Sequence, residues 1–122
     1  MSLFKKIDVV SYNVAKWEEA KRFYGQTLGL PMAFSSEEFG WIQYGVENET
    51  QVAINRWTEA EPVPQGGGAT AVFSVDDAHK TIAELRKRGV RCDDPQVVPG
   101  MVTYGTFYDP DGNRLQMAGP PQ

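Results

Sequence analysis

The chain has 122 residues, a mass of 13.6 kDa and a formal net charge of −4 at pH 7. Hydrophobic residues make up 41% and charged residues 23%, which is typical of a globular protein and argues against disorder throughout. The 16 acidic residues against 12 basic ones argue against nucleic-acid binding, because phosphate contacts need a basic surface. The one cysteine, Cys92, excludes an intrachain disulfide. The length predicts a single domain.

The first half of the chain predicts a strand, a helix and three further strands. Apolar side chains between Trp17 and Leu28 recur at spacings of three and four, the pattern of an amphipathic helix. Gly29 and Pro31 are suited to end this helix. The strands are expected at residues 7–14, 32–35, 39–46 and 51–57, with a turn at 47–49.

The second half repeats this plan after a stretch rich in proline and glycine. That stretch predicts a linker at about 59–68 between module one, about 3–58, and module two, about 69–119, within one domain of residues 1–122. A helix is expected after a cap at Asp76 or Asp77, ending at Gly89. The strands of this module are expected at residues 69–75, 90–92, 101–109 and 113–118.

The segment Asp109-Pro110-Asp111-Gly112-Asn113 predicts a tight turn between the last two strands. Proline presets its φ angle, glycine can take a positive φ, and aspartate side chains accept hydrogen bonds from nearby backbone amides. We therefore expect a structural role for this segment rather than a catalytic one.

Three segments, in this order, resemble the vicinal oxygen chelate superfamily, which includes glyoxalase I, bleomycin-resistance proteins, fosfomycin-resistance enzymes and extradiol dioxygenases. They are Phe23-Tyr24 with Leu28-Gly29-Leu30-Pro31, Phe73-Ser74-Val75-Asp76-Asp77 with the helix ending Leu85-Arg86-Lys87-Arg88-Gly89, and Asp109-Pro110-Asp111-Gly112-Asn113. The resemblance implies an α+β fold in which two βαβββ modules form a curved mixed sheet, with helices outside and a ligand cleft inside. It also implies a homodimer.

Strand alternation separates an apolar face from a mixed one in both modules. The mixed face combines small residues, neutral hydrogen-bonding groups and aromatic rings, which favours a small-molecule site or a dimer interface over an ordinary solvent-exposed face. The predicted ligand-binding residues are Val9, Ser11, Trp41, Gln43, Asn55, Trp57, Thr70, Ser74, Tyr104, Thr106, Tyr108, Arg114 and Gln116.

Metal-dependent members of the superfamily hold a divalent cation through His, Glu or Gln at set positions of the sheet. The resemblance places these positions at Val9, Thr70 and Gln116. Valine cannot ligate, threonine is a poor ligand, and glutamine offers one neutral oxygen. The single histidine, His79, is expected to be exposed in the first turn of the second helix. We therefore predict no metal ligand and no cofactor, with a divalent metal disfavoured.

The mixed face also offers few side chains suited to general acid–base chemistry. Its ionisable residues are Arg114, which stays charged, and Tyr104 and Tyr108, which titrate near pH ~10. No catalytic residue is therefore predicted.

The favoured function is a small-molecule-binding protein without the usual metal ligands, resembling the bleomycin-resistance proteins. The alternative is a glyoxalase-like or dioxygenase-like enzyme (a lyase, epimerase or oxygenase) with an atypical or absent metal site. A third interpretation is a dimeric module that acts with another protein. The acidic balance favours a cationic ligand while Arg114 favours an anionic one, so the ligand's charge stays open. No membrane-spanning run or leader is visible, which predicts a cytoplasmic protein.

Overall fold

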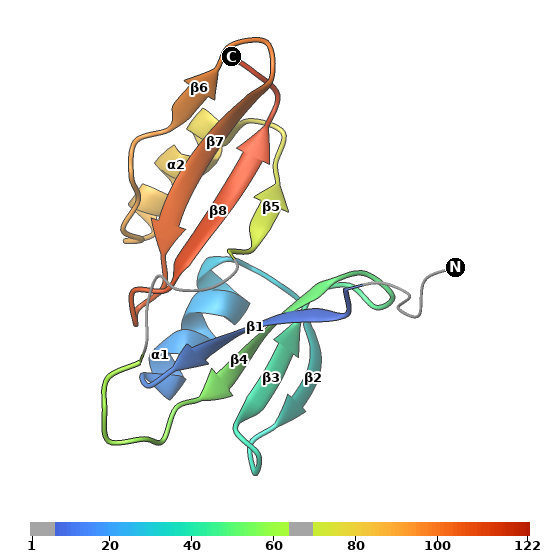
Figure 1. The fold of residues 1–122 in the computed structure, drawn as a ribbon, viewed down its shortest axis with the longest axis vertical. Coiled ribbons are helices and arrows are strands. Elements are labelled where there is room, and N and C mark those ends of the chain that lie inside the picture. Colours follow the sequence, from blue (N-terminus) through green and yellow to red (C-terminus); the bar gives the residue numbers. More distant parts are fainter. Residues whose placement is uncertain (1–6, 64–69) are drawn as a thin grey trace. The chain divides into compact units, whose positions relative to one another are not determined.

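The computed structural model describes residues 7–63 and 70–122. The chain divides into two compact units, one for each predicted module. Each unit contains a four-stranded mixed sheet and one helical segment, in the order strand, helix, strand, strand, strand (Figure 1). This confirms the predicted α+β fold of two βαβββ modules. The strands form two sheets, one in each module. Part of the expected linker, at 64–68, lies outside the described residues.

The first unit is built on a sheet with strand order β1-β4-β3-β2, in which β1 runs parallel to β4 and the other pairs are antiparallel. Its elements are β1 (Val9–Val14), α1 (Trp17–Arg22), the π-helical turn η1 (Phe23–Thr27), β2 (Met32–Ser36), β3 (Trp41–Tyr44) and β4 (Gln51–Arg56). The strands lie close to their predicted positions.

The predicted first helix is present but ends in a wide turn. The amide of Leu28 donates to the carbonyl of Phe23, five residues earlier, over 2.8 Å. A regular α-helix bonds each amide to the carbonyl four residues earlier, so this turn contains one extra residue. The adjacent rings of Phe23 and Tyr24, at the start of this turn, are both buried. Tyr24 stacks on Tyr44 of β3 at 6.0 Å between ring centroids. Gly29 then ends the helix with a φ of 74°, as predicted.

The second unit repeats the arrangement with strand order β5-β8-β7-β6 and a parallel β5–β8 pair. Its elements are β5 (Val72–Ser74), α2 (Ala78–Lys87), β6 (Gln96–Val98), β7 (Val102–Tyr108) and β8 (Arg114–Gly119). Asp77 caps α2, since its Oδ1 accepts the amide of Lys80 at 3.0 Å. Gly89 follows the helix with a φ of 82°.

The strand predicted at 90–92 is wrong in position. Cys92 makes only an isolated bridge to Phe107, and the edge strand of this sheet is β6. The amide of Asp93 donates to the carbonyl of Thr106 over 2.9 Å, so the segment begins to pair with β7 early. Pro95 has no amide hydrogen for that pairing, and regular pairing resumes only after it.

The Asp-Pro-Asp-Gly-Asn segment is a turn organised by one carboxylate, as predicted. Oδ1 of Asp109 accepts the amides of Asp111 at 3.0 Å and Asn113 at 2.8 Å. Oδ2 accepts the side-chain amide of Asn113 at 2.9 Å. Asp109 is only 5% exposed, and Gly112 has a φ of 87°. This carboxylate therefore serves the β7–β8 connection.

Residues of the predicted apolar faces form the cores, whereas Val46, which alternation also places on that face, lies beyond the end of β3 and is 56% exposed. Buried residues of the first sheet include Val14, Ile42, Tyr44, Val52 and Ile54, and those of the second include Phe107, Leu115 and Met117. The helices supply Trp17, Ala20, Ile82 and Leu85 to the same cores. The other face of each sheet is therefore the one available for function. Within the described ranges, no helix combines the length and the apolar character that crossing a membrane requires.

Candidate functional site

The open face of the first sheet, opposite its buried core, carries most of the predicted site residues of that module. Ser11 pairs with Ala53, which pairs in turn with Gln43 on β3. Asn55 lies between β1 and β3 in the same way, opposite Trp41. The described strand residues of this face are Val9, Ser11, Asn13, Phe34, Ser36, Trp41, Gln43, Gln51, Ala53 and Asn55. None of these ten side chains is ionisable.

A chain of hydrogen bonds links three of these side chains to the hairpin between β3 and β4. The indole Nε1 of Trp41 donates to Oε1 of Gln43 over 3.0 Å. Nε2 of Gln43 donates to Oε1 of Gln51 over 2.7 Å. Nε2 of Gln51 then donates to the backbone carbonyl of Val46 over 3.2 Å. We call Trp41, Gln43 and Gln51 the amide chain.

A second amide pair lies beside the amide chain. Nδ2 of Asn55 donates to Oδ1 of Asn13 over 3.1 Å, between neighbouring strands. The sequence reasoning missed both Asn13 and Gln51. Alternation from Val9 and from Asn55 would have placed both on this face. Trp57 follows the end of β4, and its indole donates to the carbonyl of Glu61 over 2.8 Å.

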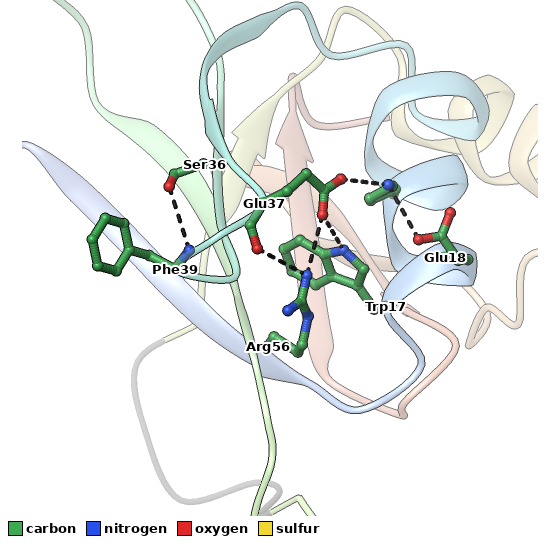
Figure 2. A network of polar contacts seen from close by, with 7 residues as sticks. Trp17, Glu18, Ser36, Glu37, Phe39 and Arg56 are labelled. Carbon is green, nitrogen blue, oxygen red and sulfur yellow. Dashed lines mark hydrogen bonds and ion pairs between the residues drawn. The ribbon is translucent and has the colours of Figure 1, made fainter.

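A network of charged groups in this unit lies beside the helix. The carboxylate of Glu37 accepts the indole of Trp17 at 2.9 Å, Lys21 at 2.6 Å and Arg56 at 3.1 Å (Figure 2). The guanidinium carbon of Arg56 lies 4.6 Å from the centroid of the Trp17 ring. The hydrogen bond from Lys21, followed by that from Trp17, lowers the pKa of Glu37. This network joins α1 to the β2–β3 turn and the end of β4, so its role is structural.

The open face of the second sheet also brings predicted residues together. Gln116 on β8 lies opposite Thr106 on β7, and its Nε2 donates to the Thr106 hydroxyl over 2.9 Å. Ser74 and Tyr104 lie on either side of Ala118. Tyr104 and Gln116 are half-buried and Ser74 is exposed.

Arg114 occupies the end of this face nearest the start of β8. Its Nη2 and Nε donate to the hydroxyl of Thr70 over 3.0 and 3.3 Å. The guanidinium group therefore lies directly beside a position where the family resemblance implies a metal ligand. A fixed positive charge at that position repels a divalent cation.

Tyr108, opposite Arg114, belongs to a separate polar cluster. Its hydroxyl donates to Asp93 over 2.8 Å, and the guanidinium carbon of Arg91 lies 3.9 Å from its ring centroid. The hydrogen bond to Asp93 raises the pKa of Tyr108, so its phenol stays protonated at neutral pH. Tyr108 is therefore a hydrogen-bonding or stacking group rather than a base.

The residues present do not fit the divalent metal of the metal-dependent family members. Val9 has no donor atom, the Thr70 hydroxyl contacts a guanidinium, and the Gln116 amide bonds to Thr106. Across residues 7–63 and 70–122, no group of three or more His, Cys, Asp or Glu side chains is placed to hold a metal.

The histidine and the cysteine lie away from the open faces, and His79 is exposed as expected. His79 is exposed in the first turn of α2, where its Nδ1 contacts Oε1 of Gln122. Cys92 is half-buried beside β7, and this burial raises the pKa of its thiol. A protonated thiol is a weak nucleophile.

The fold is that of a protein built from two βαβββ modules, each with one open sheet face. The family model for the Glyoxalase/Bleomycin resistance protein/Dioxygenase superfamily matches residues 6–117. The chain therefore belongs to this superfamily, which confirms the resemblance seen in its three motifs.

The chain is similar to the following three proteins, among others. The uncharacterized protein YraH of Bacillus subtilis (strain 168) is 28% identical over 118 residues, covering 85% of this chain and 90% of YraH. TnmS3, an antibiotic binding protein from Streptomyces sp. CB03234, is 26% identical with a TM-score of 0.79, covering 98% of this chain and 99% of TnmS3. A glyoxalase/bleomycin resistance protein from the same organism is 26% identical with a TM-score of 0.71, covering 96% and 100%.

Proposed function

We propose that this protein binds a small, uncharged organic molecule with a planar aromatic part, and that it does so without a divalent metal. The observation that carries the proposal is the open face of the first sheet. There the ring of Trp41 lies among neutral amides, and the described strand side chains carry no charge. A planar molecule stacks on an indole, and neutral amides orient its polar edge.

The second sheet supports the same class of ligand. Its open face offers the hydroxyl of Thr106, the amide of Gln116 and the ring of Tyr104. Arg114 supplies the only formal charge among its described strand residues. The likeness to TnmS3, a protein described as antibiotic binding, supports binding over catalysis.

The proposal includes a homodimer, as the family resemblance implies. Two apolar side chains on β2 are exposed, Met32 by 63% and Phe34 by 55%. Exposed apolar side chains of this kind support association with another protein surface. Sedimentation equilibrium of the purified chain tests this part. A monomer at all concentrations would remove the dimer from the proposal.

Ligand binding is tested by tryptophan fluorescence against a panel of uncharged planar aromatic molecules, with anionic and cationic analogues of the same ring systems. We expect quenching by uncharged members and its loss in Trp41→Phe. Trp17→Phe is the matched control for removing an indole, since Trp17 is buried in the core and only 9% exposed. Quenching that survives in Trp41→Phe, or a preference for charged analogues, would contradict the proposal.

Metal binding is the competing outcome. The purified protein is incubated with Mn²⁺, Fe²⁺, Ni²⁺ and Zn²⁺, dialysed, and analysed for metal content. We expect no retained metal. About one metal per chain would instead support the enzymatic alternative of a lyase, epimerase or oxygenase.

A further inference from the structure

We propose that Gln43 and Gln51 are positioning residues that hold the indole of Trp41 in one orientation on the open face of the first sheet. This inference rests on the proposed function, because it assigns to the amide chain the task of presenting the Trp41 ring to the ligand. Neither glutamine needs to touch the ligand for this task.

The two ends of the amide chain fix its direction. The indole Nε1 of Trp41 can only donate, and the backbone carbonyl of Val46 can only accept. Between these ends, Gln51 donates to Val46 and therefore turns its own oxygen toward Gln43. Gln43 donates to that oxygen and turns its own oxygen toward the indole. Each amide thus has a single orientation that satisfies both neighbours.

The backbone around the hairpin is shaped for the last member of the chain. Gly45 has a φ of 134°, and a Cβ atom on it would lie 3.1 Å from Cγ of Gln51. The lack of a side chain at this position lets Gln51 pass close to the backbone. The carbonyl of Val46 is itself held in the turn, where it also accepts the amide of Glu49 at 3.2 Å.

We therefore expect a ligand to contact the face of the Trp41 ring. Its one hydrogen-bond donor is engaged by Gln43, so a ligand meets the π surface rather than the indole N–H. Holding the ring before binding removes part of the ordering cost that a mobile side chain would add to association. A change at Gln51 should thus act on Trp41 through Gln43.

The first experiment needs no ligand. The indole N–H signals of Trp17, Trp41 and Trp57 are recorded by nitrogen-15 NMR, and Trp41→Phe assigns the second. In Gln43→Leu and Gln51→Leu we expect the Trp41 signal to move upfield and its hydrogen exchange to accelerate about fivefold, the effect of one neutral hydrogen bond. The other two signals should stay in place.

Two comparisons separate positioning from a general loss of structure. Gln26→Leu makes the same substitution at an exposed site of η1 and should leave all three signals unchanged. In Gln43→Glu the carboxylate still accepts from the indole but cannot donate to Gln51, so the Trp41 signal should lose less protection than in Gln43→Leu. If Gln43→Leu fails to fold, Gln51→Leu still decides. A Trp41 signal identical to that of the native protein in Gln51→Leu would overturn the proposal.

The second experiment uses the uncharged aromatic dye N-phenyl-1-naphthylamine. We expect Gln51→Leu to weaken its binding about fivefold and Gln26→Leu to leave it unchanged. Unchanged dye affinity in Gln51→Leu, with a displaced Trp41 signal, would overturn the link between ring orientation and binding. If the native protein binds neither the dye nor the panel, the proposed function fails, while the indole signals still decide whether the amide chain positions Trp41.

Discussion

Replacing Asp109 by alanine should cost more stability than any other single change in the β7–β8 turn. The carboxylate of Asp109 accepts three hydrogen bonds, at 3.0, 2.8 and 2.9 Å, and is 5% exposed. Two of the donors belong to buried Asn113 and the third, the amide of Asp111, is half-buried. Each buried donor left unsatisfied costs about 1–3 kcal/mol. Discounting the half-buried donor, we expect a loss of about 3 kcal/mol in the free energy of unfolding.

Urea denaturation followed by circular dichroism measures this loss, with Asp109→Asn as the matched control. The asparagine oxygen still accepts both backbone amides, and only the contact with the Asn113 side chain must rearrange. We expect Asp109→Asn to cost about 1 kcal/mol, the value of one hydrogen bond. A cost below about 1 kcal/mol for Asp109→Ala would refute the reasoning, because it would show that solvent or a shifted turn satisfies all three donors.

Three further predictions concern packing and charge. Gly105→Ala should destabilise the second unit by about 1–3 kcal/mol in thermal unfolding, because its Cβ would lie 2.8 Å from Cγ1 of Ile82; unchanged stability would mean that α2 yields freely. The amide hydrogen bond from Lys80 lowers the pKa of Asp77, so its stabilising effect is present above its ordinary pKa and is lost as pH falls through the lowered one. Asp77→Asn should therefore flatten acid unfolding, and an unaltered pH profile would contradict this. Glu37→Gln should lower the thermal midpoint and weaken its salt dependence, whereas an unchanged midpoint would show that its three partners contribute nothing measurable.

Strand alternation predicted the two faces of each sheet because a period of two is a local property of the chain. It places Trp41, Gln43, Thr106 and Gln116 on the open faces, where the structure also has them. The Asp109 turn was equally predictable, since each of its residues favours a turn for its own reason.

The parts that the sequence did not predict depend on how neighbouring strands pair. The pairing partner of β7 could not be placed, because residues on both sides of Pro95 contact β7 and only the later ones form a regular ladder. The amide chain was missed because Gln51 on β4 contacts Gln43 diagonally on the neighbouring strand β3, where Gln43 lies opposite Ala53. Side-chain hydrogen bonds of this kind follow from register, which becomes known only when the strands are paired.

The wide turn at Phe23–Thr27 makes the first helix tolerant of a change in length. A residue gained or lost in a regular helix turns everything after it by about 100°. Here the extra residue is absorbed within one turn, and the helix still ends at Gly29. Deleting Gln26 would return the segment to regular winding, while Phe23 and Tyr24, which precede it, would keep their register with Trp17–Arg22. Length differences among relatives are therefore expected at this turn rather than within Trp17–Arg22.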